Sequence, residues 1–177
     1  LLLFDGLTAH DGENQVVPSL AESWDFDPDA CAYTFHLREG VRWHDGQPFI
    51  AEDVKFTIEA IMNPENESEN APDFEDVLEI AVPDDRTAVF YLAAPNAAFL
   101  DYMTMPVLPK HLLEGEDFQT SGFFRNPVGT GPYKLERWEE GQAITLIRND
   151  DYFKGPAQIP SIVFKIVPDD NAKALQM

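Results

Sequence analysis

The stretch YTFHLREGVRWHDGQPFIAEDV, residues 33–54, decides most of what the sequence predicts about the fold. Its first six residues alternate between apolar and polar side chains, so Tyr33, Phe35 and Leu37 share one face of a predicted strand. Two glycine-containing turns then enclose a short aromatic segment around Trp43. The stretch therefore predicts a half-buried strand that continues through a tight loop into a helix.

That helix is predicted over residues 51–62, because apolar side chains recur there at the spacing of one helix face. Acidic residues occupy the first turn, where the helix dipole favours negative charge. A proline follows at position 64 and disfavours helical conformation in the residue before it, so the helix ends there. The apolar face consists of Val54, Ile58, Ile61 and Met62.

The rest of the chain supplies further short elements without a regular alternation of strand and helix. Turn residues at 25–30 precede the first strand, and an acidic loop is expected over 65–76. Strands are predicted over residues 87–92, 133–138, 143–148 and 162–167, the second and third as a hairpin and the last as a central strand. Helical pieces are predicted around residues 99–103 and 109–114, and a further helix opens at Asp169 and Asp170. This mixture predicts an α/β fold of the mixed α+β kind in one domain.

Composition limits the partners of the protein. Twelve basic residues face 32 acidic ones in a chain of 177, giving a formal net charge of −20. Such a surface repels phosphate backbones and anionic lipid, so we expect no nucleic acid partner. The acids keep the protein soluble, and steering of cationic solutes is a second interpretation. No apolar run is long enough to cross a membrane, and the chain opens without an initiator Met or a basic leader region.

Motifs that would carry catalysis or bind a metal are incomplete. Residues 129–131 begin like a dinucleotide loop, but Lys134 stands where the third glycine is required, so a tight turn explains them better. Residues 25–29 begin like a calcium loop, but Ala30 replaces its glycine. The histidines lack the paired spacing of zinc sites, and Cys31 has no recognisable partner set. We therefore expect a protein without catalytic residues, metal or cofactor, and not an enzyme.

Seven segments resemble, in the right order, segments typical of one family of extracytoplasmic proteins. They are LFDGL (3–7), VPSLAESW (17–24), YTFHLREGVRWHDGQPF (33–49), AEDV (51–54), PKH (109–111), NPVGTGPYKL (126–135) and RNDDYF (148–153). The family is that of the peptide- and nickel-binding solute-binding proteins, which supply ABC importers. The resemblance extends over essentially the whole chain. One departure concerns stability: Ile50 stands where the family carries Thr or Ser as a helix cap, a loss of about 1 kcal/mol unless another group satisfies the free amides.

The resemblance implies a fold of the periplasmic-binding-protein type II, in which two lobes close on a solute. Residues 1–177 would form a single partial domain, most of lobe one, with a mixed sheet, a hairpin and flanking helices. The second lobe and the returning C-terminal segment are then absent from the sequence. A sheet that lacks strands exposes unpaired edges, so we expect self-association through them.

The resemblance also suggests which residues line the cleft. It places residues 2–8 at the cleft edge, with the backbone groups of Asp5, Gly6 and Leu7 as first candidates for holding a ligand main chain. The alternative is that Phe4 and Leu7 are core residues and Gly6 a turn. Residues 68–74 and 103–105 occupy places where relatives line the cleft. The complete set of candidates is Leu2, Phe4, Asp5, Gly6, Leu7, Thr8, Asn70, Met103 and Met105.

The function implied is the capture of oligopeptides or dipeptides outside the cytoplasm and their delivery to ABC permease subunits. The location would be the periplasm, or the surface of a Gram-positive cell through a lipid anchor. A nickel chelate is an alternative solute, but residues 105–108 lack the arginine that nickel-chelate binders tend to carry there. The same fold could also serve as a sensor or chaperone-like binding module, and an enzyme is the least favoured function. We expect residues 1–177 alone to bind solute weakly or not at all.

Overall fold

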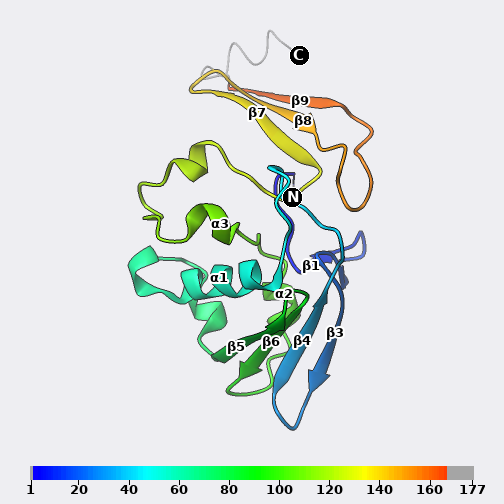
Figure 1. Cartoon of the computed structure of the whole chain (residues 1–177), viewed down its shortest axis with the longest axis vertical. Helices are drawn as coiled ribbons and strands as arrows, with labels where there is room; N and C mark the ends of the chain where they lie inside the picture. Colours follow the sequence, from blue (N-terminus) through cyan, green and yellow to red (C-terminus); the bar gives the residue numbers. More distant parts are fainter. Residues whose placement is uncertain (1, 167–177) are drawn as a thin grey trace.

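The computed structural model describes residues 2–166 and places their strands in three antiparallel sheets (Figure 1). The smallest sheet pairs β1 (Thr8–His10) with β2 (Val16–Pro18). The second sheet has the order β3-β4-β6-β5 and the third the order β7-β8-β9. Their strands are β3 (Ala21–Asp27), β4 (Ala32–Leu37), β5 (Val77–Asp84), β6 (Thr87–Leu92), β7 (Tyr133–Glu139), β8 (Ala143–Arg148) and β9 (Ser161–Lys165). The fold class is confirmed, but the strands of the described part form antiparallel sheets rather than one mixed sheet.

One long helix and several short turns of helix complete the described part. They are α1 (Ala51–Met62), α2 (Phe99–Tyr102), α3 (Lys110–Leu113) and the 3-10 turns η1 (Pro64–Asn66), η2 (Ala71–Phe74) and η3 (Gly122–Arg125). The predicted helix over residues 51–62 and the two predicted helical pieces are confirmed. None of the helices within residues 2–166 is both long and apolar enough to cross a membrane.

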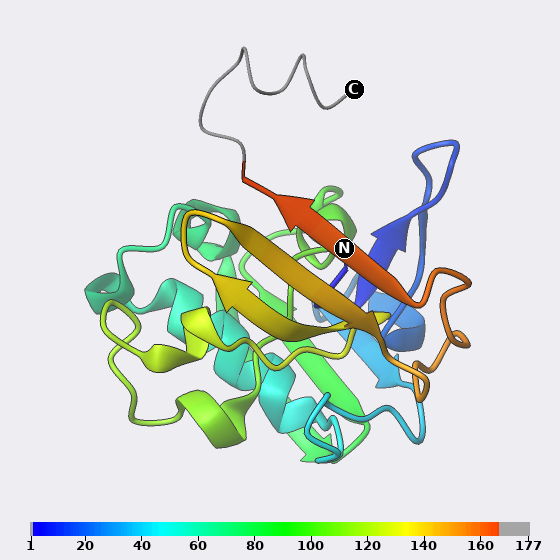
Figure 2. The same ribbon diagram turned by 90° about the horizontal axis from the view of Figure 1, so that it is seen from above.

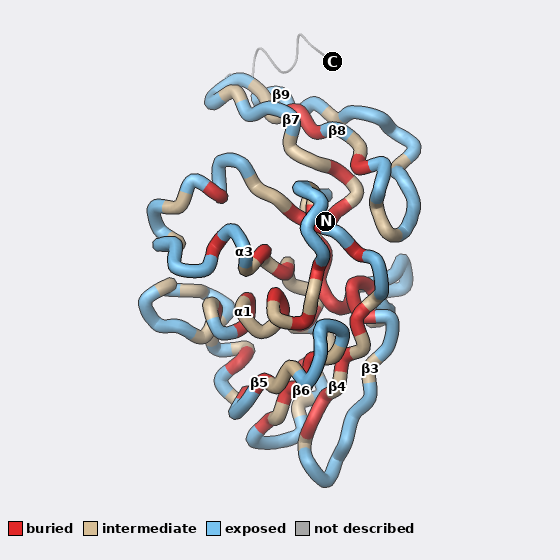
Figure 3. Tube along the Cα trace, viewed as in Figure 1, coloured by how far each residue is buried: buried red, intermediate tan, exposed pale blue. Residues whose placement is uncertain are grey.

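The main core lies between α1 and the four-stranded sheet, whereas the β7-β8-β9 sheet lies at the other end of the molecule (Figures 1 and 2). Figure 3 shows the buried residues gathered around α1, β4 and β6. Phe35 of β4 packs edge-on against Phe90 of β6 with 5.6 Å between ring centroids, and Phe90 in turn packs against Phe99 of α2 at 5.4 Å. Edge-to-face pairs add about 0.5–1.5 kcal/mol to the burial of each ring.

The predicted face of α1 points into this core. Val54, Ile58 and Ile61 are buried, while Met62, the last residue of the helix, is half-buried. These residues pack where α1 contacts β5 and β6. The 3.6-residue period is therefore sufficient to identify which side of the helix leaves water.

The N-terminus of α1 has other partners in place of a side-chain cap. Ile50 is the N-cap residue and its side chain offers no hydrogen bond. The Ile50 amide donates instead to Oδ2 of Asp53 at 3.0 Å, and the Ala51 amide donates to the carbonyl oxygen of Asp85 at 2.8 Å. The Asp53 amide, which a Thr or Ser side chain at position 50 would serve, donates instead to the carbonyl oxygen of Ile50 at 3.0 Å, so these contacts take over part of the role of a side-chain cap.

The last strand differs from its prediction. β9 spans Ser161–Lys165 and pairs only with β8 among the described strands, so it is an edge strand and β8 is the central one. The hairpin turn at residues 139–142 places β7 on one side of β8, which leaves only the other side for β9. The prediction of a central strand over residues 162–167 is therefore wrong. The helix predicted from Asp169 lies outside the described residues.

The turn predicted before β4 is too long, because it was inferred from turn-favouring residues alone. β3 continues to Asp27 and its partner β4 begins at Ala32, so the turn is confined to residues 28–31 rather than 25–30. Asp27 Oδ1 accepts hydrogen bonds from the amides of Asp29 and Ala30, which closes this tight turn. The loop expected over residues 65–76 contains η1 and η2.

Candidate ligand-binding site

Residues 2–8 lie between the two larger sheets and are held from both sides by backbone hydrogen bonds (Figure 1). The carbonyl oxygen of Leu2 accepts from the Tyr133 amide at 3.0 Å, and that of Leu3 accepts from the Gly131 amide at 2.9 Å. Farther along, the Thr8 amide donates to the carbonyl oxygen of Met103 at 3.2 Å. The segment is thus fixed in an extended path before any ligand arrives.

Two close backbone approaches explain the glycines of this region. A Cβ at Gly6 would lie 2.6 Å from the carbonyl oxygen of Met103, which is closer than side chains tolerate. A Cβ at Gly131 would lie 2.5 Å from the carbonyl oxygen of Leu2. Residues 129–131 are therefore a crossing point where one backbone packs on another. The chain bends there without forming the hydrogen-bonded tight turn that the sequence predicted.

The side chain of His44 forms two hydrogen bonds that hold the same crossing point in place. Its Nδ1 accepts a hydrogen bond from the Gly129 amide at 3.1 Å, and its Nε2–H donates to the carbonyl oxygen of Gly131 at 3.0 Å. Accepting at Nδ1 requires a neutral ring, because both nitrogens of a protonated histidine are donors. Burial lowers the pKa of His44 below its ordinary value, and the bond to Gly131 opposes this shift only in part. Neutral His44 thus holds the loop that supports residues 2–3.

A hollow of about 410 Å³ opens beside this segment. Four predicted residues, Phe4, Asp5, Gly6 and Thr8, contribute to its wall. The other five lining residues come from β1, from the connection between β2 and β3 and from the segment after α2, and of these only Thr104 lies in a segment that the sequence suggested. They are Ala9, His10, Ser19, Thr104 and Pro106.

The Asp5 carboxylate is the most constrained polar group at the hollow. Oδ1 accepts from the Tyr152 hydroxyl at 2.9 Å, and Oδ2 accepts from the Thr130 hydroxyl at 3.2 Å. Burial raises the pKa of the Asp5 carboxyl, and the two hydroxyl donors and the charge of Lys154 offset the rise only in part. Burial and the nearby Asp5 also raise the pKa of Tyr152, so its hydroxyl remains a donor.

Lys154 completes this network from the segment that follows β8. Its Nζ donates to the Ser19 hydroxyl at 2.9 Å, and it lies 5.2 Å from the centroid of the Phe153 ring. Burial lowers the pKa of Lys154, while the charge of Asp5 opposes the shift. No sequence signal connects Lys154 or Tyr152 with Asp5, because about 150 residues separate them along the chain.

Among the backbone groups predicted to hold a ligand, the carbonyls of residues 5–7 already accept hydrogen bonds within the protein. The carbonyl oxygen of Asp5 accepts from the Val107 amide at 3.0 Å, and that of Gly6 accepts from the Leu20 amide at 3.1 Å. The carbonyl oxygen of Leu7 accepts from Ser19 and Ala21. These oxygens have one or more partners each, so the side chains that line the hollow are the better-placed groups for a ligand.

The remaining predicted residues lie in different surroundings. Leu7 and Met103 belong to the buried core, as the core interpretation of Leu7 requires, and Met105 packs against that core. Leu2 is partly exposed at the start of the segment. Asn70 is exposed at the beginning of η2, a turn that contacts α1, and it does not line the hollow. The structure thus brings Phe4, Asp5, Gly6 and Thr8 together and leaves Asn70 apart.

The polar groups that line the hollow are hydroxyls, a carboxylate and a histidine. His10 Nε2 lies 2.8 Å from Oδ1 of Asp101, so a second carboxylate contacts one of the lining residues. Within residues 2–166, no group of three or more His, Cys, Asp or Glu side chains is arranged to hold a metal ion. This arrangement can hold a polar solute by hydrogen bonds and charge.

Similarity to known proteins agrees with this description. A model of the bacterial extracellular solute-binding proteins, family 5 Middle, matches residues 15–177. The chain is 32% identical over 182 residues to the oligopeptide-binding protein AppA of Bacillus subtilis, covering 99% of this chain and 34% of AppA. It is 31% identical over 186 residues to the dipeptide-binding protein of Escherichia coli, covering 92% of this chain and 34% of that protein. The chain thus spans about a third of the length of the curated relatives it matches.

Two solved structures resemble the whole described fold. The structure of NikZ from Campylobacter jejuni in complex with Ni(L-His) has a TM-score of 0.93 and 39% identity, covering 99% of this chain and 36% of NikZ. That of AppA from Bacillus subtilis in complex with a nonapeptide has a TM-score of 0.90 and 31% identity, again covering 99% and 36%.

Proposed function

The chain belongs to the bacterial extracellular solute-binding proteins of family 5, and on that premise we propose that it is part of the substrate-binding component of an ABC importer. It captures oligopeptides or dipeptides outside the cytoplasm and delivers them to permease subunits in the membrane. The observation that carries this proposal is the TM-score of 0.90 to AppA, a protein solved with a nonapeptide.

In this proposal, residues 1–177 form most of lobe one of a two-lobed clamp. Relatives about three times longer than this chain have room for a second lobe that closes over the solute. Capture then needs no bond making or breaking, so we propose that the protein is not an enzyme. A rigid wall in lobe one suits this mechanism, because a preorganised site loses little conformational freedom on binding.

The proposed contacts on this lobe centre on the hollow beside residues 2–8. Phe4, Asp5, Gly6 and Thr8 line it directly, and Leu2, Leu7, Met103 and Met105 support or extend its wall. Asn70 remains a candidate only if the ligand extends beyond the hollow. A peptide main chain suits these surroundings, because its amides and carbonyls can pair with hydroxyls and backbone groups without regard to its side chains.

A nickel chelate is the second candidate solute. It is favoured by the similarity to NikZ, which has the higher identity and TM-score of the two structures. Against it, Met105 to Leu108 offer no cation before Pro109. A binding module that serves a sensor or a chaperone, without an importer, is the alternative of a different class.

The solute can be identified and placed in one experiment. Native mass spectrometry of the protein purified from its own host identifies any co-purified ligand, and calorimetry with trialanine and with Ni(L-His) then compares the two classes. Trialanine binding with no heat from Ni(L-His) supports the peptide proposal, and the reverse result replaces it with the chelate. Turnover of the peptide during the titration would contradict the proposed absence of catalysis.

Two glycine variants test the position of the site. Gly6→Ala introduces a Cβ against the backbone of residues 103 and 104, whereas Gly12→Ala has no atom within 4 Å of the new Cβ. We expect the first to weaken binding about tenfold or more, equivalent to about 1.4 kcal/mol, and the second to leave it unchanged. Equal affinity in both variants, with unchanged unfolding temperatures, would move the site away from Gly6.

The family is extracellular, and we propose a periplasmic location or a lipid-anchored cell surface for this member. We also propose that residues 1–177 on their own associate through β9, which is the edge strand of the β7-β8-β9 sheet among the described strands. Val163 and Phe164 of β9 are both exposed, and an exposed edge strand offers unpaired backbone groups to a second copy. Light scattering that finds only monomer at high concentration would contradict this association.

A further inference from the structure

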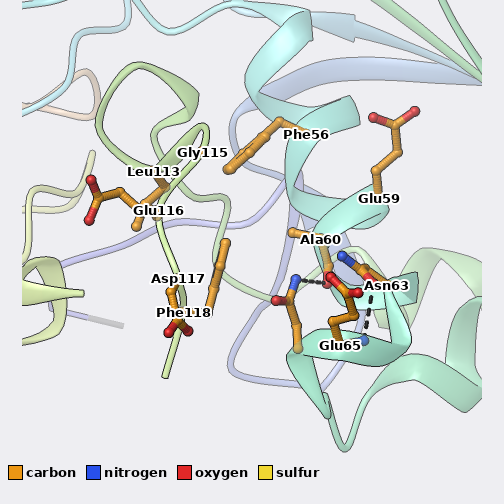
Figure 4. Close-up of a pocket in the computed structure, with 11 residues that line it drawn as sticks. Phe56, Glu59, Ala60, Asn63, Glu65, Leu113, Gly115, Glu116, Asp117 and Phe118 are labelled. Carbon is orange, nitrogen blue, oxygen red and sulfur yellow. Dashed lines mark hydrogen bonds between the residues drawn. The ribbon is translucent and has the colours of Figure 1, made fainter. Parts of the chain in front are cut away.

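A second, larger hollow lies away from the candidate site and shares no residue with it (Figure 4). Its volume is about 470 Å³, and it lies between the end of α1 with η1 on one side and the segment after α3 on the other. We call it the α1/α3 groove, defined by Phe56, Glu59, Ala60, Asn63, Glu65, Asn66, Leu113, Gly115, Glu116, Asp117 and Phe118.

Phe56, Leu113 and Phe118 give the α1/α3 groove an apolar floor patch among its polar lining residues. The half-buried rings of Phe56 and Phe118 lie 6.3 Å apart between centroids, and the buried Leu113 is a further lining residue. Phe118 also lies 6.1 Å from the ring of Phe124, whose side chain is 45% exposed. Apolar surface therefore continues from the groove to its outer side, which is the arrangement of an interaction surface rather than of a sealed core.

The rim of the groove is acidic on both sides. Glu59 and Glu65 lie on the α1 and η1 side, and Glu116 and Asp117 on the other (Figure 4). No lysine or arginine is among the lining residues. Glu59 has the one nearby cation recorded in the described part, Lys55, at 3.9 Å and largely in solvent, an arrangement that contributes little.

The walls are held in place without a ligand. The Asn66 side-chain amide donates to the carbonyl oxygen of Ala60 at 2.8 Å, and the Gln119 side-chain amide reaches the carbonyl oxygen of Asn66 at 3.5 Å across one end of the groove. Gly115 turns the chain out of α3 with a φ of +81°, a conformation that other residues adopt only with strain. The shape of the groove is therefore preformed.

We propose that the α1/α3 groove is a docking site for a segment of a partner polypeptide that carries apolar side chains alternating with Lys or Arg. Apolar side chains fill the floor over Phe56 and Phe118, while cations face the carboxylates of both rims. A polypeptide is favoured over a small solute because the rim carboxylates are exposed and the groove is open. Small-molecule sites bury most of their ligand, whereas an open groove is occupied by side chains that project from a larger partner.

The probe for this test is a hexapeptide of alternating Leu and Lys with acetylated and amidated ends, titrated into the full chain by calorimetry. Blocking the ends removes the charges by which a solute-binding cleft could read peptide termini. Glu65→Lys with Glu116→Lys reverses one charge on each rim, and we expect about tenfold weaker binding. Phe118→Ala removes half of the aromatic floor, and a loss of about fivefold or more is expected.

The matched control carries Glu13→Lys with Asp29→Lys, two exposed acids outside the groove that change the net charge of the chain by the same amount. Its affinity for the hexapeptide should stay within about twofold of the unchanged chain, because exposed charges far from the groove are screened. Three outcomes overturn the proposal. They are an equal loss in both charge variants, no binding by the unchanged chain, and binding of phenethylammonium as tight as that of the hexapeptide.

Discussion

Asp53 carries the sharpest prediction about stability, because one buried carboxylate joins three parts of the fold. Oδ2 accepts from the Ile50 amide at 3.0 Å and from the Trp43 indole N–H at 3.2 Å. Oδ1 accepts from the Lys110 amide at 3.0 Å. The carboxylate thus fixes the N-terminus of α1, the aromatic loop before it and the start of α3. The perturbations are Asp53→Ala and Asp53→Asn.

The magnitude follows from what each substitution leaves unpaired. Asp53→Ala leaves three hydrogen-bond donors without an acceptor, and a buried donor without a partner costs about 1–3 kcal/mol. The Trp43 N–H is deeply buried, whereas the amides of Ile50 and Lys110 are only partly so. We therefore expect Asp53→Ala to lower the free energy of unfolding by about 3–5 kcal/mol.

Asp53→Asn should cost much less. Burial raises the pKa of Asp53, with hydrogen bonds from Ile50, Lys110 and Trp43 as the opposing causes, so the ionised form gains little from the fold. An amide oxygen still accepts hydrogen bonds while the amide N–H₂ faces one donor, which predicts a loss of about 1–2 kcal/mol.

Urea unfolding followed by tryptophan fluorescence measures both losses, and thermal unfolding checks them at about 2–4 °C per kcal/mol. The control is Glu52→Ala in the same helix turn, which removes only a half-exposed ion pair with Lys110 at 3.0 Å. It should change stability by less than about 1 kcal/mol. A loss below about 1 kcal/mol for Asp53→Ala, or equal losses for Ala and Asn, would refute the reasoning.

Further predictions concern pH, packing and the backbone crossing. Because burial lowers the pKa of His44 from 6.5, the unfolded chain binds the proton more readily, so stability falls as pH drops below that value. His44→Asn removes this pH-dependent loss. The difference in free energy of unfolding between the unchanged chain and the variant should therefore shrink between about pH 7 and about pH 5. A difference that stays constant over this range contradicts the role given to neutral His44. Phe35→Ala opens a cavity at the centre of the aromatic core and should cost about 3–5 kcal/mol in urea unfolding. Leu78→Ala changes a side chain that is 70% exposed, so it should leave the free energy of unfolding almost unchanged. Equal losses in the Phe35 and Leu78 variants would contradict the position of Phe35 in the core. Gly131→Ala forces two backbones apart and should cost about 1–3 kcal/mol in the same assay, so an unchanged midpoint would argue against the crossing.

Local patterns predicted the secondary elements well where one face is buried. The alternation in residues 33–38 corresponds to β4 and the helical stripe to α1, because each pattern reports which side of an element leaves water. The prediction failed where a strand has little periodicity. β3 is exposed along most of its length, and its Asp-rich end reads as a turn until the partner strand is known.

The candidate site was only partly within reach of the sequence. Phe4, Asp5 and Gly6 could be named because they lie in one short segment of a recognisable pattern. Tyr152 and Lys154 could not, because no local pattern connects groups so distant along the chain. Hydrogen bonds of this kind form only when folding brings two distant elements together, so neither the composition nor the residue spacing of the sequence predicts them.

By itself, the sequence determined the strand before the aromatic loop, the helix after it, the acidic surface and the family to which the chain belongs. The tertiary structure alone decided that β9 is an edge strand within residues 2–166, that the carbonyls of Asp5, Gly6 and Leu7 bond within the protein, and that a groove opens between α1 and the segment after α3. The physical reason is that the two kinds of feature depend on interactions of different range along the chain. Periodicity and turn chemistry act over a few neighbouring residues, whereas edges, pockets and buried polar networks depend on which distant surfaces meet.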